Sequence, residues 1–128
     1  MKLVRDVPLR TIPVVEPQTT LDEVVALMET EPLKTVALVG DEMYMGLFNE
    51  EALQSPLIPE GADLALLTVG PYVHRVRVIA EPEDDAALVL THLLRRNQAV
   101  APVVANRTFR GVVTQEDLAT TLEQEKTV

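Results

Sequence analysis

The chain repeats itself at an offset of 65 residues, with no insertion or deletion between the matching positions. A fixed period of this length indicates two copies of one supersecondary unit. Because a unit of about 65 residues has only a marginal core of its own, we expect the copies to pack together, share one core and form a cleft. The matches are Glu16-Pro17 with Glu81-Pro82, Gly46-Leu47-Phe48 with Gly111-Val112-Val113, and Glu51 and Leu53 with Glu116 and Leu118.

Local patterns in the first copy predict the order strand, helix, strand, strand, helix. Residues 20–23 read Thr-Leu-Asp-Glu, the capping-box pattern that begins a helix. Pro32 ends that helix because proline has no amide donor. Residues 35–39 and 44–48 are expected to form the two strands of a hairpin. Asn49 is then expected to cap a short helix.

The second copy follows the same path. Asp84 or Asp85 is expected to cap a helix, whose apolar residues recur at helical spacing. Residues 100–104 and 109–113 are expected to pair as strands, and Thr114 to begin the last helix.

These elements define the predicted fold class, which is α/β (α+β). Each of two pseudo-symmetric repeats is expected to carry a three-stranded sheet packed by two helices. We place the first repeat at 1–56, a connector at 57–66 and the second repeat at 67–128, all within one module. Leu118 and Leu122 lie four residues apart on the last helix and form a candidate dimer surface.

Composition excludes several classes of protein. The chain has no Cys, which rules out thiol catalysis and zinc–thiolate sites. It has no apolar run near the length of a membrane span and no apolar signal region, so we expect a cytoplasmic protein. The net charge of -9 disfavours nucleic acid and anionic membranes as partners. We also find no nucleophile–base pattern and no glycine-rich phosphate loop, so we do not expect an enzyme.

Charge is distributed unevenly between the two copies. Residues 1–65 hold 12 acidic and 4 basic residues, whereas residues 66–128 hold 8 and 7. A small anionic ligand is therefore expected to favour groups from the second half.

Other polar residues have simple structural explanations. His92 lies between apolar neighbours on a predicted helix and is expected to pack or to sit at an exposed edge. His74, beside Arg75 and Arg77, belongs to a small basic group that forms either a solvated edge or a contact for an anion. The acidic residues within 81–85 precede a helix, whose dipole accounts for them, so we expect no metal site.

The segment from Gly111 to Leu118 is the strongest candidate for chemistry. Thr114 stands at the predicted N-cap, and Asp117 lies one turn further on. One explanation is a capping box, in which the two side chains satisfy each other's main-chain donors. The other is a nucleotide site, because a helix N-terminus favours phosphate and a carboxylate one turn in can accept from a ribose diol.

This segment resembles a known family. Gly, two β-branched residues, Thr, two variable residues, Asp and Leu close each copy in cystathionine β-synthase-type (CBS) domains. The openings at 4–7 and 69–73, the strand-like 78–82 and the apolar-Pro-Val segment 101–104 are also similar to the family, in the same order. The resemblance to a tandem CBS pair, or Bateman module, covers nearly the whole chain.

The resemblance implies a module that pairs into a homodimer and binds an adenosine-containing ligand between its copies. The expected ligands are of AMP, ADP, ATP or S-adenosylmethionine type. Carried over by position, Asp117 would hold the ribose hydroxyls and Thr114 the phosphate. Four further residues would flank the adenine through apolar contact and main-chain hydrogen bonds, namely Ile79, Ala80, Val100 and Ala101.

The first copy departs from the family pattern. Asn49 stands where Thr or Ser is usual, and Ala52 stands where Asp is usual, so this copy's site is expected to be degenerate. We therefore expect a sensory module, with no cofactor, that signals to a separate effector protein. The alternative is a ligand-independent interaction or scaffold protein with the CBS fold. A tandem ACT-like amino-acid sensor is a third candidate, against which the strand-strand-helix ending argues.

Overall fold

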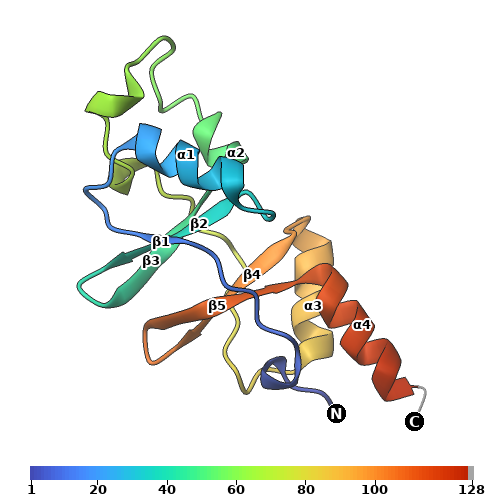
Figure 1. The fold of residues 1–128 in the computed structure, drawn as a ribbon. Coiled ribbons are helices and arrows are strands. Elements are labelled where there is room, and N and C mark those ends of the chain that lie inside the picture. The colour runs from blue at the N-terminus through green and yellow to red at the C-terminus, as the bar shows by residue number, and fades with distance from the viewer. Residues whose placement is uncertain (127–128) are drawn as a thin grey trace. The chain divides into compact units, whose positions relative to one another are not determined.

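The computed structural model describes residues 1–126, which form two compact units. One is continuous and comprises Ile12–Arg75, and we call it the central unit. The other combines Met1–Thr11 with the chain from Val76 onward, and we call it the split unit. Each unit therefore contains the helices and hairpin of one repeat and the opening segment of the other (Figure 1).

The central unit is built on a three-stranded sheet of order β1-β2-β3. Its strands are β1 (Val14–Val15), β2 (Thr35–Gly40) and β3 (Met43–Asn49), and its helices are α1 (Leu21–Thr30) and α2 (Glu50–Leu53). Strand β1 is parallel to β2, and β2 is antiparallel to β3. The predicted hairpin is confirmed, as is the Asn49 cap, whose Oδ1 accepts from the Ala52 N–H at 3.0 Å. Short 3₁₀ turns, Leu64–Leu66 and Gly70–Tyr72, follow in the second half of the unit.

The split unit has a hairpin and two helices that lie side by side (Figure 1). A 3₁₀ turn, Val4–Asp6, opens it. Its further elements are α3 (Ala86–Arg96), β4 (Val100–Ala105), β5 (Thr108–Thr114) and α4 (Gln115–Lys126). Strands β4 and β5 are antiparallel, and a turn at Asn106 and Arg107 with positive φ joins them.

The third strand expected in the second repeat is reduced to a single bridge, between Ala80 and Val103. In the central unit, the Ala37 N–H donates to the Pro13 carbonyl at 2.9 Å and extends the β1–β2 pairing. Pro102 occupies the equivalent place on β4 and has no N–H to donate. The amide of Gln98 instead donates to the Val78 carbonyl at 2.9 Å. The proline therefore explains why this edge pairs more briefly.

Helices α3 and α1 begin by different means. Asp85 caps α3, because its Oδ1 accepts from the Ala87 N–H at 2.9 Å. The capping box expected at Thr20 is wrong, since Thr20 makes no side-chain cap hydrogen bond. There the Leu67 carbonyl accepts from the first helical N–H, that of Leu21, at 2.9 Å, so a tertiary contact satisfies a donor that the box would have left exposed to water.

Buried apolar side chains form two clusters, one within each unit, where the sequence predicts a single shared core. The central cluster includes Phe48 and Leu21, and the split-unit cluster includes Leu93 and Leu118. Leu118 is 0% exposed and Leu122 packs against the same cluster. The candidate dimer surface on this side of α4 is therefore wrong, because Leu118 belongs to the core of the split unit. Within the described residues, no helix is both long and apolar enough to cross a membrane.

In each unit an opening segment pairs with the edge of the hairpin. Arg10 exchanges two main-chain hydrogen bonds with Val112 on β5, at 2.8 and 2.9 Å, and His74 does the same with Leu47 on β3, at 2.7 and 3.1 Å. A glycine precedes each of the paired strand residues. At Gly111 a Cβ would lie 2.8 Å from the Arg10 carbonyl oxygen, at a φ of +146°. Only glycine allows this close approach of backbones.

Replacing that glycine tests how tight the crossing is. Gly111→Ala is expected to lower the free energy of unfolding by about 2–3 kcal/mol, because it adds a clash with main chain to an unfavourable φ. Urea denaturation measures the change. Gly61→Ala is the matched control, since Gly61 has a φ of +74° and no heavy atom within 4 Å of the added Cβ, and about 1 kcal/mol is expected there. Equal losses at the two positions would contradict the proposed steric origin.

Candidate functional site

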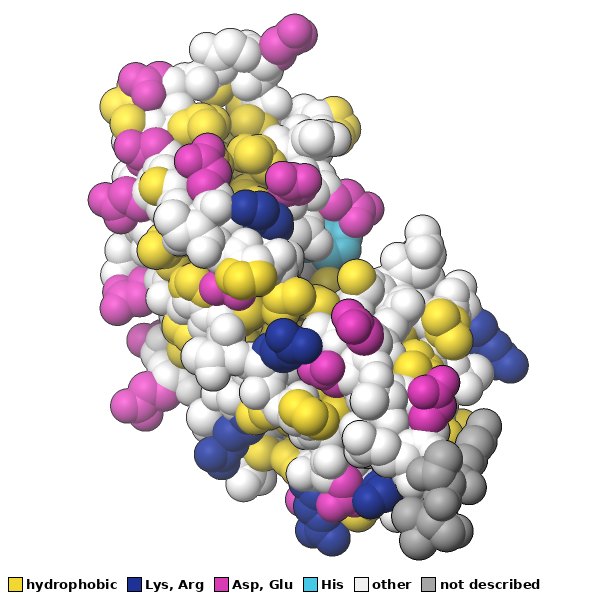
Figure 2. All heavy atoms as spheres, turned by 45° about the vertical axis from the view of Figure 1, so that its right-hand side comes forward, with side chains coloured by type: hydrophobic (Ala, Val, Ile, Leu, Met, Phe, Trp, Pro, Cys, Tyr) yellow, Lys and Arg dark blue, Asp and Glu magenta, His cyan; other side chains and the backbone are white. Residues whose placement is uncertain are grey.

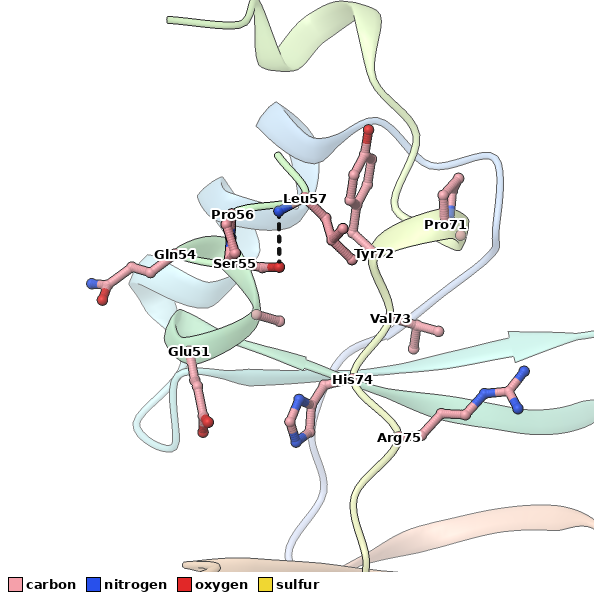
Figure 3. A pocket seen from close by; sticks show the side chains of 12 residues that line it. Glu51, Gln54, Ser55, Pro56, Leu57, Pro71, Tyr72, Val73, His74 and Arg75 are labelled. Carbon is pink, nitrogen blue, oxygen red and sulfur yellow. Dashed lines mark hydrogen bonds between the residues drawn. The ribbon is translucent and has the colours of Figure 1, made fainter. Parts of the chain in front are cut away.

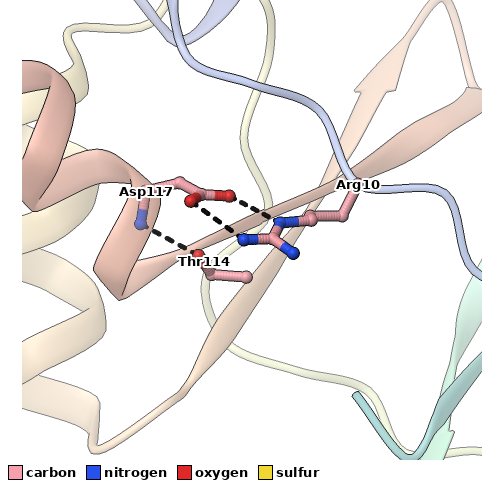
Figure 4. Close-up of polar contacts among 3 residues, drawn as sticks. All are labelled: Arg10, Thr114 and Asp117. Atoms are coloured by element: carbon pink, nitrogen blue, oxygen red, sulfur yellow. Dashed lines mark hydrogen bonds and ion pairs between the residues drawn. The ribbon is translucent and has the colours of Figure 1, made fainter. Parts of the chain in front are cut away.

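The N-terminus of α4 positions the polar residues singled out in the sequence. Strand β5 ends at Thr114, which is 8% exposed, and the helix begins one residue later. The Thr114 Oγ1 accepts from the Asp117 main-chain N–H at 3.0 Å (Figure 4). This is one half of a capping box. The Thr114 side chain also hydrogen-bonds to the Asp117 carboxylate, which helps to lower the pKa of that carboxyl.

The Asp117 carboxylate does not complete that box. It accepts from Arg10 through two bonds, Nε to Oδ2 at 2.8 Å and Nη2 to Oδ1 at 3.1 Å (Figure 4). Such a forked pair fixes both groups in one plane. The Asp117 side chain is 15% exposed and that of Arg10 is 50% exposed, so the pair lies at the surface with the carboxylate on its inner side.

The ion pair also sets the ionisation of both groups. The hydrogen bond from Arg10 holds the pKa of the Asp117 carboxyl below its ordinary value, although partial burial acts in the opposite direction. The same bond raises the pKa of Arg10. The carboxylate is therefore charged near neutral pH and already occupied. A ribose diol would have to use its remaining lone pairs or displace the guanidinium.

The residues expected around an adenine differ in accessibility. Ile79 is 49% exposed and Val100 is half-buried, whereas Ala80 and Ala101 are both 0% exposed and belong to the core cluster. The main chain of Ala80 bonds to β4, donating to the Pro102 carbonyl and accepting from Val104. Among the hydrogen bonds of residues 1–126, none involves the Ile79 main chain. Ile79 thus offers both an apolar side chain and unused main-chain groups.

Gln98 occupies the polar groups next to this position. Its amide accepts from the Val78 N–H at 3.1 Å and donates to the carbonyls of Val78 and Val100 at 2.9 and 2.8 Å. The main-chain carbonyl of Gln98 accepts from the Gln115 side chain at 2.8 Å. Gln98 therefore links the segment before α3 to the start of α4.

Sequence reasoning missed both Arg10 and Gln98. Arg10 lies 107 residues from Asp117 in the chain, and it is brought there only by the pairing of the opening segment with β5. No local sequence pattern distinguishes Arg10 among the eleven basic residues of the chain. Gln98 has a weak local signal, since it follows the helix end at Asn97, which has a left-handed φ of 52°. Neither residue could be assigned a role without the tertiary structure.

Two pockets in the described chain are lined by residues other than Thr114 and Asp117. The larger, of about 830 Å³, belongs to the central unit. The smaller, of about 440 Å³, belongs to the split unit and is lined on one side by Val4, Arg5, Val7 and Leu9. In the central unit the place equivalent to Asp117 is taken by Ala52, which is 4% exposed.

Comparison with known families identifies the architecture. The family model for the CBS domain matches residues 4–55 and 69–124. The chain therefore belongs to the CBS domain family, as a pair of such domains. A search of curated proteins found no significant match.

Solved structures with the same fold cover nearly the whole chain. A CBS domain pair/ACT domain protein from Thermotoga maritima is 21% identical with a TM-score of 0.78, over 97% of this chain and 98% of that one. CBSX2 in complex with AMP is 18% identical with a TM-score of 0.80, over 98% and 99%. The CBS domain of a bacterial CNNM/CorC family Mg²⁺ transporter in complex with ATP is 24% identical with a TM-score of 0.73, over 95% and 87%. These likenesses establish the fold.

The Arg10–Asp117 pair predicts a pH dependence of stability. A carboxylate whose pKa is lower in the folded state stabilises the fold above its unfolded pKa, and this contribution is lost as the pH falls through the folded pKa. The ordinary pKa of this carboxyl group is 3.8. The loss of stability should therefore begin near pH 4 and continue below it. Asp117→Asn should flatten this part of the curve, as measured by urea denaturation at pH 5, 4 and 3.

Arg10→Gln provides the matched variant, because it removes the cause of the lowered pKa and leaves the carboxylate. Its curve should be flattened in the same range. A curve for Arg10→Gln as steep as that of the wild type would show that the pair does not couple to folding.

Proposed function

We propose that this chain is a regulatory module that binds an adenosine-containing ligand at the start of α4 and signals to a partner. The observation that carries the proposal is the set of Thr114, Asp117 and Ile79 within one unit, with a hydroxyl, a charged carboxylate and unused main-chain groups. The AMP and ATP complexes of CBS proteins with the same fold support this class of ligand.

In the proposed complex each group has a separate task. Asp117 accepts from the ribose hydroxyls, and the Thr114 hydroxyl donates to a phosphate at the positive end of the α4 dipole. Ile79 contacts the adenine. In this complex Arg10 changes position, because it holds both carboxylate oxygens of Asp117 in the free protein. Once displaced by the ribose, its half-exposed guanidinium stays near the start of α4, where it can pair with a phosphate.

Signalling follows from differences in affinity. A ligand shifts the populations of two states only as far as it binds one of them better, and couplings of about 1–3 kcal/mol are typical. We propose a binding and not a catalytic role. Only the second repeat is proposed to bind an adenosyl ligand, because Asn49 and Ala52 give the first repeat no carboxylate at the equivalent place.

A scaffold that binds no nucleotide is the competing function. The observation in its favour is that the one carboxylate available for a ribose is already paired, by Arg10. In that case the pair is a structural clasp between the opening segment and α4.

Calorimetric titration with AMP, ADP, ATP and S-adenosylmethionine separates the two functions. We expect saturable binding of at least one ligand, and at least a tenfold loss of affinity in Asp117→Ala, since the ribose contact disappears. Asp22→Ala is the control, because Asp22 is exposed in the first turn of α1. Silence across the panel would favour the scaffold.

Arg10→Ala gives a second, independent readout. If Arg10 only blocks the carboxylate, all four ligands should bind more tightly to this variant. If Arg10 also contacts phosphate, ATP and ADP should lose affinity relative to S-adenosylmethionine. Unchanged affinities for the whole panel would show that the ligand does not meet this pair.

We further propose that the module forms a homodimer through α3, and that the effector is a separate protein. Leu88 and Leu94 on this helix are 57% and 60% exposed, which is costly for side chains of this size. Leu94→Glu should convert a dimer to a monomer in size-exclusion chromatography with light scattering. Leu66→Glu, at an 80% exposed position in the central unit, should leave the dimer intact. A wild-type protein that is still monomeric at about 100 μM, a concentration at which weak complexes form, would overturn this proposal.

A further inference from the structure

The two units provide a comparison of the same position with different residues. Arg10 pairs with Val112, and His74 pairs with Leu47, through equivalent main-chain hydrogen bonds. Val112 and Leu47 are equivalent in the repeat, so His74 is the structural counterpart of Arg10. Ala52 is the counterpart of Asp117. Both members of the ion pair of the split unit are therefore different in the central unit.

A pocket of about 830 Å³ lies where the pair is missing. It is lined by α2, by the turn that follows it and by the opening segment of the second repeat (Figure 3). The His74 imidazole lies on the α2 side of the opening segment, toward Glu51, whereas the Arg75 side chain extends the other way (Figure 3). No ion pair joins His74 to Glu51 within the described residues, and an imidazole can donate a hydrogen bond in either protonation state.

The rest of the lining is mixed, with Gln54 and Ser55 as further polar members. Leu57 is 73% exposed, and Tyr72 and Val73 are partly buried against the central core cluster. The remaining apolar members are Pro56 and Pro71. A pocket of this volume, with both apolar and polar lining residues, has the size of small-molecule sites.

Charge restricts the ligand further. The central unit contains eleven acidic residues and two basic ones, Lys34 and Arg75, and acidic side chains are prominent on the face drawn in Figure 2. Glu51 also lines the pocket. Such a field repels a multiply charged anion. A single negative charge beside His74 is tolerated, because physiological salt screens its repulsion by the more distant acidic residues.

We propose that this pocket binds a small monocarboxylate with an apolar body. The ligand carboxylate accepts from His74 in the space that Ala52 leaves, as the Asp117 carboxylate accepts from Arg10 in the split unit. The apolar body contacts Leu57 and Tyr72. The site shares no residue with the adenosyl site at Thr114 and Asp117, so each can fail without the other.

Three small probes of similar shape test the charge requirement, namely benzoate, neutral benzamide and doubly charged phenyl phosphate. Two-dimensional ¹H–¹⁵N NMR of the whole protein reports binding at the amides of Ala52 and His74. We expect saturable shifts with benzoate, and at least tenfold weaker binding of both benzamide and phenyl phosphate. No saturable shift with benzoate, or equal binding of benzamide, would overturn the proposal. Tighter binding of phenyl phosphate would overturn the assignment of a monocarboxylate.

Variants test the position. Ala52→Asp supplies an internal carboxylate and should weaken benzoate at least tenfold, whereas Asp117→Ala should leave benzoate binding unchanged. His74→Gln removes the imidazole and leaves the buried Ala52 in place. It therefore decides the matter if Ala52→Asp does not fold, and a tenfold loss of benzoate affinity is expected. Arg77→Gln, at an exposed position outside the pocket, is the control. Wild-type affinity in His74→Gln would show that the carboxylate does not bind there.

Discussion

The pairing of each opening segment with a hairpin edge is the constraint on which the rest of the structure depends. Two main-chain hydrogen bonds hold Arg10 against Val112, and Gly111 makes room for the approach. This contact completes the split unit and also determines which side chain reaches the first turn of α4. The geometry of Asp117 is thus a consequence of a backbone contact between residues far apart in sequence.

Much of the fold could be predicted from the sequence, because its signals are local. The hairpins and the Asn49 and Asp85 caps each depend on residues a few positions apart, and the structure confirms them. The errors arose where a tertiary contact prevailed. The Leu67 carbonyl took the role expected of Thr20, and packing in the split unit buried Leu118.

The candidate site was less accessible to sequence reasoning than the fold. Thr114 and Asp117 were found because they lie three residues apart in a recognisable pattern, and the hydrogen bond between them follows from helix geometry. Arg10 was not found, because only the long-range pairing brings it to the carboxylate. The replacement of Arg10 by His74 in the other unit was equally hidden, since the opening segments align with a period one residue shorter than the rest of the repeat.

The exchange of opening segments sets an order of events during synthesis on the ribosome. All of residues 12–75 are available once that continuous stretch has emerged, so the half that they form can close early. Residues 1–11 must wait for a hairpin and a helix that emerge more than 75 residues later. Closing so long a loop costs entropy that grows only slowly with its length, but contacts of such high sequence separation slow folding. Until they form, residues 1–11 lack their native strand partner.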